Sequence, residues 1–145
     1  MIDILFGTYG GSNTWYGLCN TLDFWEEELD RKNLFITMDE DDSAYLLEWV
    51  FEKYYDKTIN EANMFEHFEH WGENYFEVSM LGQVLKDIDG FCEQVKLHNQ
   101  GMTIEVSGCR FLRDEVISFY ERFVSIVNFL LESYPEYKYL VISGP

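Results

Sequence analysis

The chain has 145 residues and carries 27 acidic side chains against 10 basic ones, a formal net charge of −17. A charge of this sign repels a phosphate backbone, so it excludes ordinary nucleic-acid binding. Hydrophobic residues make up 47% of the chain and aromatic residues 18%, which excludes a disordered acidic tail. The length is typical of one domain with its own core.

Hydrophobic periodicity predicts alternating strands and helices in the first half of the chain. The expected elements are a strand at Ile2–Gly7, a turn at Thr8–Asn13, a helix at about Asn20–Arg31, a short strand at Leu34–Met38 and a helix at Ala44–Lys57. The acidic and hydroxyl side chains just before Ala44 suit a helix N-terminus, where they cap backbone amides and face the positive end of the helix dipole.

The second half predicts a loop followed by further strands and helices. The expected elements are a loop with a helical turn at Asn60–Trp71, a strand at Tyr75–Ser79 with Phe76 and Val78 inward, a helix at Leu81–Leu97 weakened by Gly82 and Gly90, a strand at Met102–Ser107, a helix at Phe111–Ser133 and a strand at Tyr137–Ser143. The last helix carries the strongest apolar stripe, which runs from Leu112 to Leu130 and predicts a central core helix.

These elements favour a single α+β domain over residues 1–145, with helices packed on a mixed β-sheet around the long C-terminal helix. A flavodoxin-like α/β fold is the alternative. The most apolar stretch, Phe123–Leu131, is too short to cross a membrane. The odd set Cys19, Cys92 and Cys109 and the absence of a signal-like N-terminus predict a cytoplasmic protein.

Two patterns are candidates for metal or cofactor binding. His67, His70 and Glu73 are types of residue that bind zinc or iron, but they do not form HExxH, and an exposed polar turn is the favoured interpretation. The run Gly7–Thr14 resembles the FMN phosphate loop of flavodoxins, which implies flavin or nucleotide binding. It lacks the lysine of stricter phosphate loops, and no later aromatic, glycine-rich loop follows it. We therefore expect no metal and no cofactor.

Enzymatic chemistry has no clear sequence signature either. Acid pairs such as Asp41–Asp42 and Asp87–Asp89 are expected by chance among 27 acids, and no apolar neighbours favour a raised pKa. Neither pair matches an EF-hand calcium loop. There is no G-x-S-x-G motif, and no cysteine neighbours a histidine. We expect a protein that is not an enzyme.

The acidic residues are concentrated in the first half of the chain. The segment Asp23–Glu77 holds 17 acidic and 4 basic residues, whereas Gly101–Pro145 holds 6 and 4. We expect a basic partner to bind this segment through acidic residues around aromatic anchors, which are Trp25, Tyr55 and Trp71. The acidic residues predicted to border the interface are Glu26, Glu27, Glu28, Asp30, Asp39, Glu40, Asp41 and Asp42. A merely well-solvated or salt-adapted surface is the alternative.

In overall character the chain resembles bacterial toxin-immunity proteins of the contact-dependent growth-inhibition type. The resemblance rests on size, acidity, cysteine usage and the α+β pattern, with no shared motif. It implies a protein that binds the C-terminal toxin domain of a large secreted protein, often a basic nuclease, and covers its active site. A second hypothesis is a DNA mimic, whose carboxylates occupy the DNA groove of a DNA-binding enzyme. No oligomeric state is predicted.

Overall fold

The computed structural model describes residues 3–7, 40–61, 63–64, 66–133, 135 and 138–143. In chain order its elements are β1 (Asp3–Gly7), α3 (Glu40–Phe51), the 3₁₀ turn η2 (Glu52–Tyr54), β2 (Glu73–Glu77), the 3₁₀ turn η3 (Val78–Met80), α4 (Leu81–Val95), β3 (Thr103–Val106), β4 (Cys109–Leu112), α5 (Arg113–Ser133) and β5 (Tyr139–Ser143). The α+β class is confirmed. The elements expected at Thr8–Asn13, Asn20–Arg31 and Leu34–Met38 lie outside the described residues.

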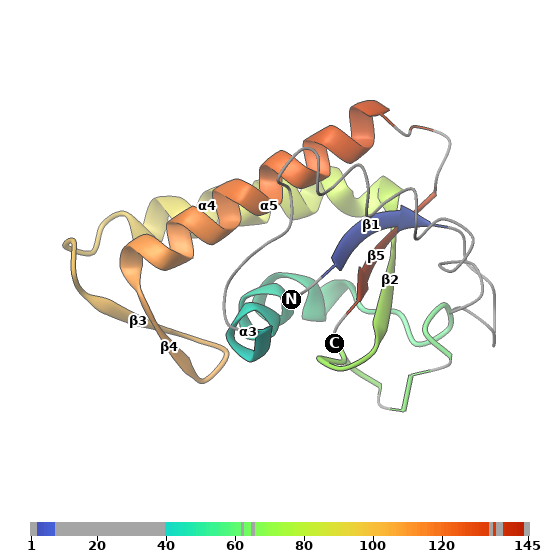
Figure 1. Ribbon diagram of the computed structural model, residues 1–145, viewed down its shortest axis with the longest axis horizontal. Helices are drawn as coiled ribbons and strands as arrows, with labels where there is room; N and C mark the ends of the chain where they lie inside the picture. Colours follow the sequence, from blue (N-terminus) through green and yellow to red (C-terminus); the bar gives the residue numbers. More distant parts are fainter. Residues whose placement is uncertain are drawn as a thin grey trace.

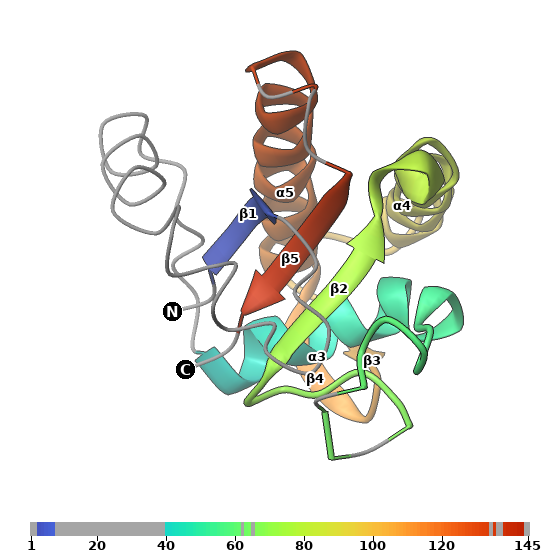
Figure 2. The same ribbon diagram turned by 90° about the vertical axis from the view of Figure 1, so that its right-hand side faces the viewer.

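The larger sheet has the strand order β1–β5–β2, and β5 is antiparallel to both neighbours. Figure 2 shows β1 and β2 running in one direction with β5 between them in the other. The mixed sheet expected from the sequence is therefore wrong for the described strands, because β5 lies between β1 and β2 and is antiparallel to both. Leu140, Val141 and Ile142 are all buried, so both faces of β5 are covered.

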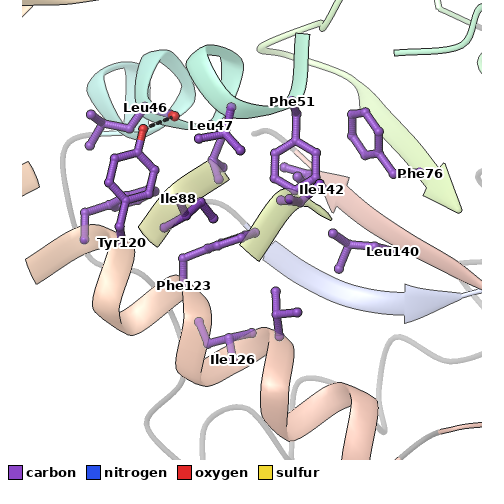
Figure 3. Packing of buried hydrophobic residues seen from close by; sticks show 14 of the residues in the cluster. Leu46, Leu47, Phe51, Phe76, Ile88, Tyr120, Phe123, Ile126, Leu140 and Ile142 are labelled. Atoms are coloured by element: carbon purple, nitrogen blue, oxygen red, sulfur yellow. Dashed lines mark hydrogen bonds between the residues drawn. The ribbon is translucent and has the colours of Figure 1, made fainter. Parts of the chain in front are cut away.

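Three helices supply most of the rest of the core, with α4 alongside α5 and α3 against both (Figure 1). The apolar stripe of α5 is buried as its spacing predicts, at Val116, Phe119, Tyr120, Phe123, Ile126, Val127 and Leu130. In Figure 3, Phe123 reaches between Phe51 of α3 and the strands, with its ring centroid 5.6 Å from that of Phe51. The predicted central helix is confirmed.

One buried hydrogen bond joins α5 to α3. The hydroxyl of Tyr120 donates to the carbonyl of Leu46 over 2.5 Å, and this links α5 to α3 (Figure 3). Burial raises the pKa of Tyr120, so its hydroxyl keeps its proton. A buried tyrosine needs such a partner, because an unpaired buried hydroxyl costs about 1–3 kcal/mol.

The last helix was predicted to begin at Phe111, but the hairpin β3–β4 occupies this part of the chain. Ser107 and Gly108 have φ angles of 49° and 82°, as the two central residues of a type I′ turn require. The turn reverses the chain direction, so Phe111 on β4 pairs with Ile104 on β3. The helix α5 therefore begins only at Arg113. Leu112, which the periodicity placed on the helical stripe, is exposed on this hairpin instead.

Smaller boundary corrections follow from tertiary packing. The second helix begins at Glu40 rather than Ala44 and ends as an α-helix at Phe51. In β2, Tyr75 and Phe76 are both buried, so the strand does not show the expected alternation, and Val78 lies beyond it in η3. None of the helices in the described part of the chain combines the length and apolarity needed to span a membrane.

Candidate functional site

The segment Tyr55–Gly72, here called the acidic loop, joins η2 to β2, and its described residues form no helix or strand. With its flanks, from Glu52 to Glu77, it holds seven acidic and two basic residues. It runs beside β2 in Figure 2, and Figure 1 places it at the opposite end of the molecule from the hairpin β3–β4. Loops this long inside a compact domain are unusual and often functional.

Asn60 holds the middle of the acidic loop against the sheet. Its side chain is almost completely buried, and its Nδ2 donates to the carbonyl of Tyr75 over 3.1 Å. Its Oδ1 accepts from the amide of Tyr75 over 2.7 Å, and Nδ2 also donates to the carbonyl of Asp56 over 2.8 Å. One side chain thereby satisfies three backbone groups of two segments.

Asn74 holds the end of the loop in the same way from within β2. Its Oδ1 accepts from the amide of Glu69, and its Nδ2 donates to the carbonyl of Glu69, both over 2.8 Å. Between the two asparagines, the carboxylate of Glu52 accepts from the amide of Phe68 over 2.8 Å. The ring of Phe68 is buried and stacks on Phe76, so an apolar contact also holds the loop against β2.

The remaining part of the loop is held by Lys57 and Asn63. Lys57 Nζ donates to the carbonyl of Asn63, and Asn63 Nδ2 donates to the hydroxyl of Tyr55 over 3.0 Å. A Cβ at Gly72 would lie 3.0 Å from Cδ of Glu69, so glycine lets this side chain approach the backbone closely. The described residues of the loop are therefore tied to β2, to η2 and to one another by side-chain hydrogen bonds.

His70 connects the loop to α3. Its Nε2 lies 3.0 Å from the carboxylate of Glu48, and its ring packs edge-on to Tyr45 at 4.8 Å between centroids. His67 Nδ1 instead faces the carbonyl of Phe68, while Glu73 accepts from the hydroxyl of Tyr75. The three side chains of the possible metal pattern therefore have separate partners. Nowhere in the described ranges do three potential ligands meet.

Two large apolar side chains project from the acidic loop. Met64 is 80% exposed and Trp71 is 63% exposed, and the acids Glu61 and Glu66 are exposed nearby in the sequence. The amide of Met64 donates to the Glu69 carboxylate over 3.3 Å, and the same carboxylate lies against Gly72. The backbone segments that carry Met64 and Trp71 therefore meet on either side of one carboxylate.

The structure describes five of the site residues predicted from the sequence, and the other six lie outside the described part of the chain. Glu40, Asp41 and Asp42 lie in the first turn of α3. Trp71 is exposed as an anchor would be. Tyr55 is half-buried, and its hydroxyl accepts a hydrogen bond from Asn63; its role as an anchor stays a prediction. Those outside the described residues are Trp25, Glu26, Glu27, Glu28, Asp30 and Asp39.

Sequence reasoning missed Met64 and the asparagines that hold the loop. A lone methionine in a polar stretch gives no periodic signal. Three asparagines within fifteen residues, Asn60, Asn63 and Asn74, were the available sign of a loop built on side-chain amides. Outside the loop, the indole of Trp49 on α3 is half-exposed and packs on Phe91 of α4 at 5.6 Å between ring centroids.

A charged cluster beside the loop is structural. Asp87 of α4 accepts from Lys53 Nζ over 2.7 Å, from the hydroxyl of Tyr54 and from Gln83. The hydrogen bonds from Lys53 and Tyr54 lower the pKa of Asp87 to about 2, so it stays ionised. This carboxylate joins α4 to η2. It does not change its protonation state near neutral pH, as a general acid or base would have to.

Comparisons with known proteins add no relative. Neither a protein-family model, nor a curated protein, nor a solved structure matches this chain.

Proposed function

We propose that this chain is an immunity or inhibitor protein that binds a basic toxin domain, such as a nuclease, and covers its active site. The observation that carries the proposal is the acidic loop, a segment of high acidic density whose described residues include the exposed Trp71 and Met64. Large exposed apolar side chains in a segment of one charge sign suit a recognition surface.

The charges around the loop support a partner of opposite sign. Both basic residues between Glu52 and Glu77 are engaged internally, Lys53 with Asp87 and Lys57 with the loop backbone. The exposed acids are left to set the outward field. Such a field accelerates the encounter with a cationic protein, and an inhibitor of a toxic enzyme needs a fast encounter.

The proposed compartment is the cytoplasm. Cys92 is buried, burial raises the pKa of its thiol, and neither Cys92 nor Cys109 is joined to another described residue by a disulfide. A protective protein for a toxin that acts inside cells would also be needed there.

The test is a pull-down with the tagged chain from lysate of the encoding cell at about 50 mM and 150 mM salt, followed by mass spectrometry and an activity assay of the retained polypeptide. Recovery of a basic polypeptide whose nuclease or other toxic activity falls on adding the chain supports the proposal. Recovery of no basic polypeptide, even at the lower salt, contradicts it. Displacement by duplex DNA of several unrelated DNA-binding proteins from the chain would favour a DNA mimic instead.

A further inference from the structure

Resting on the proposed function, we infer that Met64 and Trp71 enter an apolar pocket with a Lys/Arg rim on the partner, and that the acidic loop binds in the conformation it already has. The partner is thus defined by its chemistry, as a basic protein with an exposed aliphatic or aromatic pocket. The inference assigns the apolar contact to two side chains and gives Tyr55 and the asparagines a positioning role.

The two apolar side chains belong to backbone segments that lie close to the same carboxylate. The Glu69 carboxylate accepts from the amide of Met64 and also lies against Gly72, the residue after Trp71. The two side chains therefore project from adjacent backbone segments. Burying apolar side chains of this size is favourable enough to make them dominant contact residues.

Side-chain hydrogen bonds already hold the described residues of the loop. Ordering a flexible side chain or a loop backbone on binding costs conformational entropy. Here Asn60, Asn74 and Glu52 bond to backbone groups along the loop, while Lys57 and Asn63 hold its centre. The partner can bind these residues without that entropic cost.

Charge complementarity separates this surface from the exposed apolar residues near the hairpin β3–β4. Leu97, Met102 and Leu112 are also exposed, at the end of α4 and on the hairpin. Their surroundings include Lys96 and Arg113, whose guanidinium donates to the carbonyl of Lys96. That end of the molecule lacks the acidic excess of the loop, so a basic partner favours Met64 and Trp71.

The experiment measures the affinity of the basic polypeptide retained in the pull-down for single variants of the chain, by surface plasmon resonance. Met64→Ala and Trp71→Ala are each expected to weaken binding about 30-fold or more. The matched controls Leu97→Ala and Leu112→Ala likewise truncate exposed apolar side chains. Their affinity is expected to stay within about twofold of the wild-type value. Thermal unfolding of each variant establishes that the fold survives.

Asn63→Ala tests the positioning part. It removes the hydrogen bond to Tyr55 without truncating either apolar contact, and it is expected to speed amide exchange in the loop and weaken binding about tenfold. Faster exchange with unchanged affinity would overturn the preformed loop. Retained binding by Met64→Ala and Trp71→Ala, with a folded chain, would overturn the assignment while leaving the proposed function standing. If no basic polypeptide is retained, both fall together.

Discussion

The side-chain amide of Asn60 bonds to both backbone groups of Tyr75, at 2.7 Å and 3.1 Å, in the manner of a residue on a neighbouring strand. β2 has β5 on one side, and these backbone groups point away from it toward the acidic loop. An exposed strand edge invites pairing with other chains, and a buried amide side chain closes it at this point.

Asn60→Ala is expected to lower the free energy of unfolding by about 2–4 kcal/mol, because it leaves the buried amide and carbonyl of Tyr75 without partners. Urea denaturation followed by circular dichroism measures the change. Asn99→Ala, at an exposed turn, is the control and is expected to change stability by less than about 0.5 kcal/mol. Similar losses from both variants would contradict the structural role of Asn60.

Gly90→Ala is expected to stabilise the protein by about 0.5–1 kcal/mol, because glycine inside a helix carries extra unfolded-state entropy. Gly90 lies on the exposed side of α4, and a Cβ there would meet nothing within 4 Å. Gly108→Ala is the contrasting variant, since φ is +82° at that turn and alanine is strained there. Thermal unfolding should therefore move in opposite directions for the two variants.

Asp87→Asn is expected to reduce stability at pH 7, with a difference from wild type that disappears on acidification. The pKa of Asp87 is lowered from 3.8 to about 2 in the folded protein, first by Lys53 and then by Tyr54. Its contribution is therefore complete above the unfolded pKa near 3.8 and is lost as pH falls toward 2. Urea titrations at pH 7, 4, 3 and 2 measure it. Asp89→Asn, at an exposed position of the same helix, is the matched control for removing one carboxylate.

Fluorescence quenching of Trp71 is expected to depend on the charge of the quencher. Trp71 is 63% exposed beside the acids of the loop, so caesium ions should reach it more readily than iodide ions. The signal lost in Trp71→Phe isolates its contribution, and Trp49→Phe serves as the comparison. The preference should weaken in 1 M salt, where the Debye length is about 3 Å. A preference for iodide would contradict a negative field at this site.

Charge reversal of Glu26, Glu27 and Glu28 to lysine is expected to slow association with the basic partner and flatten its salt dependence. The residues lie outside the described part of the chain, and their place at the interface is a prediction from the sequence. Stopped-flow association at two salt concentrations measures the effect. The matched reversal of Glu115, Glu121 and Glu132, on α5, should matter much less. Equal effects would mean that the charge serves general solubility.

The sequence alone determined those features of the protein that depend on local periodicity and composition. The stripe of α5 from Val116 to Leu130, the helix at Leu81–Val95 and the alternating strand Thr103–Val106 follow from the spacing of apolar residues. The acidic character and the α+β class follow in the same way from residue content and element order.

Only the tertiary structure decided which residues meet across the chain. The insertion of β5 between β1 and β2, the pairing of Asn60 with Tyr75 and the contact of His70 with Glu48 each join segments far apart in sequence. Local sequence patterns do not predict such partners, because an asparagine in a loop has the same sequence signature whether it faces solvent or a strand edge. For the same reason no sequence pattern indicated that the hydroxyl of Tyr55 accepts a hydrogen bond from Asn63.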